Sequence, residues 1–243
     1  CDFNTYTSTE LGGGASAASY AETAIRELRL ARTVLGDRDI AVSTVFVGGG
    51  TPTLLPAADL IRVLDAIRTE FGLAADAEVT TEANPESVTA ESLAELSAGG
   101  FTRVSFGMQS SSSHVLAVLD RRHTPGRAAE VVSLARSAGF AHINLDLIYG
   151  LPYQTVSGVA TTVEKALRVA PDRVAVFGYA HVPWMKKHQA LLPEHALPDA
   201  SERFAQRAMV EAVLTEAGYT AIGLDHFARP DDALATAAAT ARL

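Results

Sequence analysis

The chain has 243 residues, a formal net charge of −8 and 48% hydrophobic residues. This composition is typical of a globular protein, and the negative charge argues against a general nucleic-acid-binding surface. No apolar run reaches the roughly 18 residues that a membrane helix needs. The single cysteine excludes an intramolecular disulfide framework and fits a reducing cytoplasm.

The predicted elements alternate between helix and strand along the chain. Apolar residues at helical spacing and Gly-rich ends define the helices, while short β-branched runs define the strands. The predicted helices are 19–35, 57–71, 90–98, 127–137, 159–169 and 201–217. The predicted strands are 44–47, 78–82, 103–107, 142–149 and 173–179, followed by a short apolar segment at 219–224. Six βα-type units in series imply an α/β fold with a parallel sheet and right-handed crossovers. A full or partial (β/α) barrel fits better than a doubly wound sheet, because no fingerprint glycines open a helix after the first strand.

The first predicted strand runs into three consecutive glycines, Gly48, Gly49 and Gly50, and then Thr51-Pro52. Such a run indicates a backbone that a ligand approaches closely or that adopts a positive φ. Ligands of α/β folds bind beyond the carboxyl ends of the strands, where this turn is predicted. The alternative is a tight turn without a ligand, which would be favoured for a single glycine.

The other predicted strands also end in polar or reactive groups. Glu82, Gln109 and Asp146 end the next three, and Tyr179-Ala180-His181 follows the fifth. Taken singly, Asp146 could be a buried structural carboxylate, and Gln109 with the serines after it could start the next helix. Together, on one rim, these residues predict a pocket for a polar, nucleoside-like ligand.

Four segments of the chain form a recognisable set of motifs: GGGTPT at 48–53, TTEANPE at 80–86, RVSFGMQS at 103–110 and NLDLIYGLP at 144–152. Together they resemble the radical S-adenosylmethionine (SAM) family, in the branch related to oxygen-independent coproporphyrinogen III oxidase. The resemblance runs from Cys1 to about Asp232. It implies a partial (β/α) barrel of the radical SAM type.

In that family a Cys-x3-Cys-x2-Cys loop ligates three irons of a 4Fe–4S cluster, and the fourth iron binds SAM. Cys1 resembles the last cysteine of this loop, so the resemblance makes Cys1 a metal ligand. The first strand and the first two cysteines would then lie upstream, and a C-terminal domain would follow Leu243. We therefore expect 1–243 to be a radical SAM core that cannot hold a normal cluster and is inactive alone. Taken without the other motifs, Cys1 would be an inert terminal residue.

The resemblance also implies SAM-binding residues. Gly49, Gly50 and Thr51 match contacts made by backbone and hydroxyl groups, and Glu82 matches a SAM ligand. A carboxylate at this place suits ribose hydroxyls or an amino group.

The oxidases bind two SAM molecules, and Gln109, Arg121 and Asp146 match positions that hold the second. Ala180 matches a further backbone contact. An arginine can bind a carboxylate through two hydrogen bonds. The alternative for Arg121 is a solvated helix arginine, since Arg122 and His123 are its neighbours.

Two segments of the second half, 176–189 and 222–232, resemble the oxidases closely. Trp184 and Met185 would supply apolar faces for a tetrapyrrole, and Lys186, Lys187 and Arg229 would supply cations for its carboxylates. The alternative is a surface charge pair beside a core tryptophan. No catalytic residue is assigned.

The first half departs from the oxidases. Phe3 replaces a fourth cysteine that the oxidases usually carry, and 1–6 and 46–55 look more like the sister group, the heme chaperones. The resemblance changes from the heme chaperones to the oxidases near residues 150–155. The chain could be a divergent member, a hybrid or a misjoined gene.

The leading functional hypothesis is oxidative decarboxylation of two propionates of coproporphyrinogen III to vinyl groups, giving protoporphyrinogen IX. The alternative is a heme chaperone in which His181, His188 or His226 is an axial ligand. A third, weaker hypothesis is a nucleotide-binding barrel without radical chemistry. The implied partners are a tetrapyrrole or heme and an electron donor, with no nucleic acid, and we expect a cytoplasmic monomer.

Overall fold

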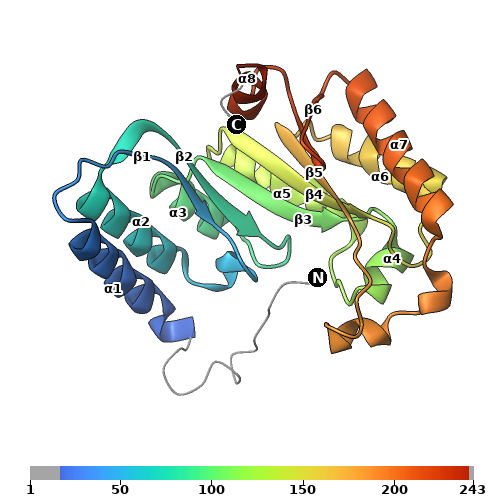
Figure 1. Ribbon diagram of the computed structural model, residues 1–243, viewed down its shortest axis with the longest axis horizontal. Helices are drawn as coiled ribbons and strands as arrows, with labels where there is room; N and C mark the ends of the chain where they lie inside the picture. Colours follow the sequence, from blue (N-terminus) through green and yellow to red (C-terminus); the bar gives the residue numbers. More distant parts are fainter. Residues whose placement is uncertain (1–16, 241–243) are drawn as a thin grey trace. The chain divides into compact units, whose positions relative to one another are not determined.

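The computed structural model describes residues 17–240, in which helices and strands alternate (Figure 1). The helices are α1 Ala17–Leu35, α2 Ala57–Phe71, α3 Ala90–Ala98, α4 Ser113–Val118, α5 Pro125–Ser137, α6 Val156–Leu167, α7 Ala200–Glu216 and α8 Ala233–Ala239. The strands are β1 Val42–Val47, β2 Leu73–Ala83, β3 Arg103–Gln109, β4 His142–Tyr149, β5 Arg173–Gly178, β6 Thr220–Ile222 and β7 His226–Ala228. The strand order is β1-β2-β3-β4-β5-β7-β6. Within the described part, the chain divides into an N-terminal unit (17–104 and 134–141) and a C-terminal unit (105–133 and 142–240).

The N-terminal unit is built on the parallel pair β1 and β2, in which Val45 pairs with Val79. Helix α2 packs against both α1 and α3 and buries Leu60 and Leu64. A capping box at Thr89 starts α3, as the sequence Thr-x-x-Ser permits. This unit therefore holds the ends of β1 and β2 on a packed helical layer.

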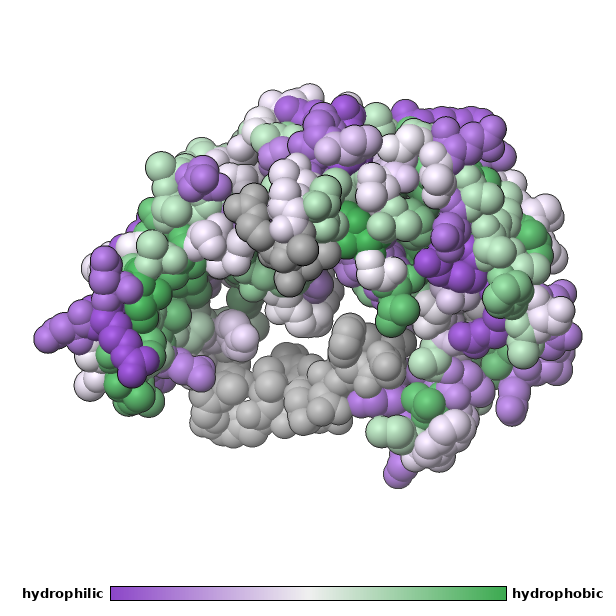
Figure 2. All heavy atoms as spheres, turned by 45° about the horizontal axis from the view of Figure 1, so that its top comes forward, coloured by the Kyte–Doolittle hydropathy of each residue, from purple (hydrophilic) through white to green (hydrophobic). Residues whose placement is uncertain are grey.

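Helix α1 has a mixed surface. It buries Ala21 and Ile25 but exposes Leu30 and Val34. Figure 2 shows hydrophobic residues beside hydrophilic ones at the left of the molecule, where α1 and α2 lie. Single apolar side chains exposed in this way are ordinary on a protein surface and indicate no site.

The C-terminal unit is built on β4 and β5, which pair in parallel with Asp146 opposite Ala175. Helices α6 and α7 pack against each other and against β4. Along β4, the buried Ile143, Leu145 and Leu147 alternate with half-buried polar residues. One face of the strand therefore builds the core, while the polar residues of the other face are half-buried.

The edge of the sheet formed by β5, β7 and β6 differs from the prediction. β6 pairs antiparallel with β7, and β7 pairs antiparallel with β5, so the expectation of a wholly parallel sheet is wrong here. Only residues 223–225 join β6 and β7, which is too short for a parallel crossover. Gly223, with φ 62°, turns the chain in this loop.

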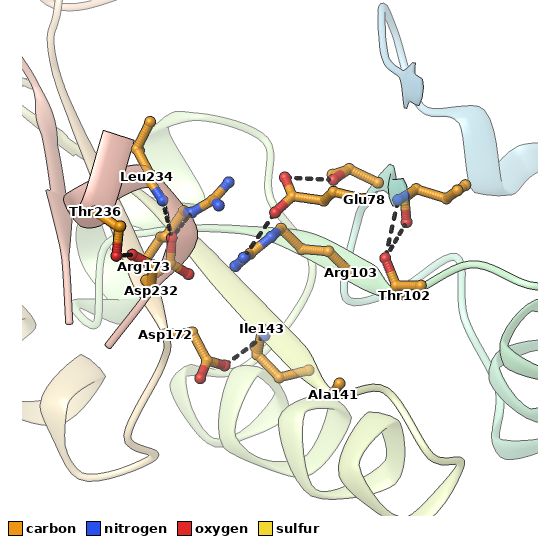
Figure 3. Close-up of polar contacts among 12 residues, drawn as sticks. Glu78, Thr102, Arg103, Ala141, Ile143, Asp172, Arg173, Asp232, Leu234 and Thr236 are labelled. Atoms are coloured by element: carbon orange, nitrogen blue, oxygen red, sulfur yellow. Dashed lines mark hydrogen bonds and ion pairs between the residues drawn. The ribbon is translucent and has the colours of Figure 1, made fainter. Parts of the chain in front are cut away.

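The predicted bounds of α2, α3 and β4 agree with the structure, whereas β2 begins at Leu73 rather than at residue 78. The short elements α4, β7 and α8 were not predicted. Helix α8 begins where Asp232 accepts a hydrogen bond from the Leu234 amide (2.8 Å), and the same carboxylate oxygen accepts from Arg173 Nε (2.7 Å) (Figure 3). Across the described residues, every helix is too short or too polar to cross a membrane.

Candidate functional site: the carboxyl ends of the strands

The glycine turn follows β1 directly. Gly49 has a φ of 116°, which L-residues rarely adopt. A Cβ at Gly49 or Gly50 would meet no atom within 4 Å, so this backbone edge is open. At Gly48, by contrast, a Cβ would lie 2.7 Å from the Phe46 ring and 3.2 Å from the Glu82 carboxyl carbon. The triplet therefore combines a close internal contact, a left-handed turn and an open edge.

Glu82 lies one residue before the end of β2 and faces this turn. The Gly49 amide donates a hydrogen bond to Oε2 of Glu82 (3.2 Å). Burial raises the pKa of Glu82, and the hydrogen bond from Gly49 lowers it by a smaller amount. Thr51 is half-buried and precedes the short 3₁₀ helix η2 (Pro52–Leu54). A half-buried carboxylate beside an open glycine edge can accept hydrogen bonds from hydroxyl or ammonium groups.

Gln109 ends β3 in a strained conformation, with a φ of 63°. Its Nε2 lies 2.7 Å from the position that a Cβ would take at Gly107. The missing side chain of Gly107 therefore makes room for the Gln109 amide. Positive φ values at residues other than glycine are uncommon and occur often at binding sites.

Asp146 lies within β4, three residues before its end, so the prediction that it ends the strand is wrong. It is half-buried, and Ser105 and Asn144 are among its hydrogen-bond partners. Oγ of Ser105 lies 3.0 Å from both carboxylate oxygens of Asp146. Nδ2 of Asn144 donates to Asp146 Oδ1 (3.0 Å) and to Ser105 Oγ (2.7 Å). Ser105 and Asn144 were not predicted as site residues from the sequence. The period of two along a strand could have indicated Asn144, because it shares a face with Asp146.

Arg121 and Ala180 lie in loops of the C-terminal unit. Arg121 is half-buried and lies in the loop after α4 rather than in a helix, and its amide donates to the Leu116 carbonyl (2.9 Å). Ala180 is exposed and follows β5, and its carbonyl accepts from Nε2 of the buried Gln189 (3.0 Å). Oε1 of Gln189 accepts from the Val182 amide. One buried side chain thus fixes the backbone on either side of His181.

The segment after Ala180 exposes its apolar side chains. Trp184 is 77% exposed and Met185 is 70% exposed, so the alternative of a core tryptophan is wrong. Lys187 is also exposed. Arg229, predicted as a substrate cation, forms an ion pair with Asp231 (3.1 Å).

The described residues supply no ligand set for an iron–sulfur cluster. The only cysteine, Cys1, lies outside them. Within 17–240 there is also no group of three or more His, Cys, Asp or Glu side chains placed to hold a metal ion. The SAM residues are a better fit, because the glycine edge is open and two half-buried carboxylates are present, Glu82 near the end of β2 and Asp146 within β4.

These features define an α/β protein with polar groups at the carboxyl ends of its strands. The family model of the radical SAM superfamily matches residues 1–166, and the chain belongs to this superfamily. The predicted fold class, an α/β partial barrel of the radical SAM type, is confirmed. Membership implies a 4Fe–4S cluster and SAM as cofactors.

Comparison with individual proteins confirms both branches of the predicted resemblance. The chain is 43% identical over 220 residues to an oxygen-independent coproporphyrinogen III oxidase of Bradyrhizobium diazoefficiens, covering 90% of this chain and 49% of that protein. It is 42% identical over 236 residues to the heme chaperone HemW of Mycobacterium tuberculosis, covering 95% of this chain and 58% of that protein. The solved structure of coproporphyrinogen III oxidase (HemN) from Escherichia coli, a radical SAM enzyme, has 36% identity and a TM-score of 0.84, covering 91% of this chain and 50% of that one. The chain thus spans about half the length of the curated relatives it matches.

Proposed function

We propose that the protein carries out the oxidative decarboxylation of two propionate groups of coproporphyrinogen III to vinyl groups, which yields protoporphyrinogen IX. The observation that supports this most is the 43% identity over 90% of the chain to a protein named as that oxidase. In this proposal 1–243 is the radical SAM core of a longer, monomeric, cytoplasmic protein that receives electrons from a donor. Cys1 is one ligand of its cluster.

The first SAM molecule binds, in this proposal, to the N-terminal unit. Gly49 and Gly50 present an open backbone edge to it, and Thr51 adds a hydroxyl group. Glu82 accepts hydrogen bonds from its hydroxyl or ammonium groups. The hydrogen bond between Gly49 and Glu82 supports this assignment, because it places backbone and carboxylate side by side.

The second SAM molecule binds to the C-terminal unit. Asp146 accepts from a hydroxyl or ammonium group, while Gln109 and Arg121 donate to acceptor groups of the ligand. The exposed backbone at Ala180 provides a further contact. Support comes from the strained Gln109 backbone and from the hydrogen bonds that fix Asp146 and Ala180.

The tetrapyrrole binds beside the segment after Ala180. Trp184 and Met185 offer exposed apolar surface, and Lys186 and Lys187 offer positive charge for propionates. Arg229 contributes only if its ion pair with Asp231 opens. The bound cofactors supply the hydrogen-atom abstraction, and the residues of this chain bind and orient the reactants.

The test is an anaerobic reaction of the full-length protein with its cluster reconstituted. Reductant, SAM and coproporphyrinogen III are added, and 5′-deoxyadenosine is quantified together with the mono- and divinyl products. Formation of both in step supports the oxidase. A formed cluster without decarboxylation would overturn the proposal.

A heme chaperone is the second candidate, favoured by the 42% identity to HemW over 95% of the chain. Three histidines are candidates for an axial ligand. Nδ1 of His181 lies 3.2 Å from the Tyr179 hydroxyl, and Nδ1 of His226 lies 3.3 Å from Asp225, while His188 is exposed. A titration with heme distinguishes the two functions: stable binding without SAM turnover identifies the chaperone, and loss of the heme spectrum on substitution identifies the ligand.

A further inference from the structure

Ser105, Asn144 and Asp146 form a hydrogen-bonded triad in the C-terminal unit, in which each side chain contacts the other two. The Ser105 hydroxyl lies 3.0 Å from each carboxylate oxygen of Asp146. The Asn144 amide nitrogen donates both to Ser105 (2.7 Å) and to Asp146 (3.0 Å). Two donors from neighbouring strands thus reach one carboxylate and restrict its rotation.

The Asn144 amide has only one favourable orientation in this triad. Rotating it by 180° would bring its oxygen against the Asp146 carboxylate and remove both donated hydrogen bonds. In the orientation found, Oδ1 of Asn144 is buried and has no hydrogen-bond donor in the described part of the chain. A buried acceptor without a donor lowers stability. The residue is therefore better explained by what it does to Asp146 than by packing.

The position of the triad in the sheet supports the same interpretation. The opposite face of β4 is already filled by the fully buried Ile143 and Leu145. On the triad's own face, Asp146 lies opposite Ala175 of β5, which has no hydrogen-bonding side chain. The triad thus lies on the face of β4 away from Ile143 and Leu145, where Asn144 and Asp146 are half-buried and Ser105 is buried.

We propose that Ser105 and Asn144 are positioning residues, which hold the Asp146 carboxylate in the orientation that binds SAM. This inference rests on the proposed function, in which Asp146 contacts the second SAM molecule. A carboxylate whose rotation is already restricted loses less conformational freedom when a ligand donates to it. The two residues therefore act on SAM affinity through Asp146 and need not touch the ligand.

The test is SAM binding to the full-length, cluster-reconstituted protein, measured by anaerobic calorimetry together with unfolding in urea. Ser105→Ala and Asn144→Ala should each weaken the second binding event about 10-fold, the loss expected for one hydrogen bond to a charged group. The first binding event should not change. Ser105→Thr keeps the hydroxyl group and should restore most of the affinity.

Thr162→Val is the matched control. Thr162 is a buried residue of α6 whose hydroxyl accepts from the Ser111 amide. Its loss should lower stability without changing SAM affinity. If Ser105→Ala and Asn144→Ala lower stability as this control does and leave the second binding event unchanged, the positioning role is wrong. If Asp146→Ala itself leaves SAM binding unchanged, the underlying site assignment is wrong instead.

Discussion

The Gly49 amide lies 3.2 Å from Oε2 of Glu82, so the turn after β1 and the end of β2 are joined by a direct hydrogen bond. Two opposing effects act on this carboxylate. The hydrogen bond favours the ionised form, but burial disfavours it more, and the pKa of Glu82 is raised. An ionised Glu82 therefore lowers stability at neutral pH, which is typical of a residue kept for binding.

Glu82→Gln should make the protein more stable at pH 7, while it weakens SAM binding. Glutamine keeps an acceptor for the Gly49 amide but carries no charge. Because the folded-state pKa of Glu82 is raised, its favourable contribution is present below the ordinary glutamate pKa and is lost as pH rises through the folded value. Urea unfolding should therefore show a higher free energy of unfolding for Glu82→Gln than for the wild type at pH 7. This difference should disappear at about pH 4.

The exposed Glu86 of the following loop provides the control for this prediction. Glu86→Gln should change neither stability nor SAM affinity. A Glu82→Gln variant that is less stable than the wild type at pH 7 would contradict the interpretation of Glu82.

Gly49→Ala and Gly50→Ala should differ in stability but agree in binding. Both substitutions add a methyl group to open space. Only Gly49 has a positive φ, so Gly49→Ala should cost at least about 1 kcal/mol, and Gly50→Ala less than about 0.5 kcal/mol. Both should weaken SAM binding in calorimetry, since the methyl groups occupy the proposed contact edge. Unchanged affinity in both variants would show that SAM does not approach this edge.

Asp232→Asn should destabilise the C-terminal unit. The Asp232 side chain is 1% exposed and pairs with Arg173 at 2.7 Å (Figure 3). Removing one charge of a buried pair costs about 3 kcal/mol or more, which urea unfolding would detect. Asp231→Asn is the control, because the Asp231 side chain is 73% exposed and its ion pair is worth less than about 1 kcal/mol. Equal losses of unfolding free energy in both variants would contradict the expected difference between the buried and the exposed ion pair.

Lys187→Glu should raise the KM for coproporphyrinogen III several-fold, because it places a negative charge beside the propionates in the proposed function. SAM affinity should be unchanged. The control is Lys165→Glu in the last turn of α6, which should leave the kinetics unaltered. If the KM of Lys187→Glu equals that of the wild type, Lys187 is a solvated surface residue.

The strand ends could be predicted from the sequence because their signals are local. A β-branched run before three glycines fixes the position of Gly49, and a strand pattern before Ala-Asn-Pro fixes Glu82. Both predictions place the residues at the ends of β1 and β2, where the structure has them. Their roles as SAM ligands stay predictions.

Other features depend on contacts between distant residues and were missed. Ser105 and Asp146 are 41 positions apart in the sequence, and their hydrogen bond exists only because β3 and β4 come together. The strands β6 and β7 have three residues each, too few for a period of two to be recognised. The start of α8 did have a signal, an aspartate cap at Asp232 before an alanine-rich run.

The central claim is that two sets of residues, one in each unit, each bind one SAM molecule. The most direct test is the SAM stoichiometry of the full-length, cluster-reconstituted protein in anaerobic calorimetry. We predict two molecules per chain for the wild type and one for Asp146→Ala, with the remaining affinity unchanged, while Glu82→Ala weakens the other binding event. One SAM per chain in the wild type, or two with unaltered affinities in both variants, would contradict the claim.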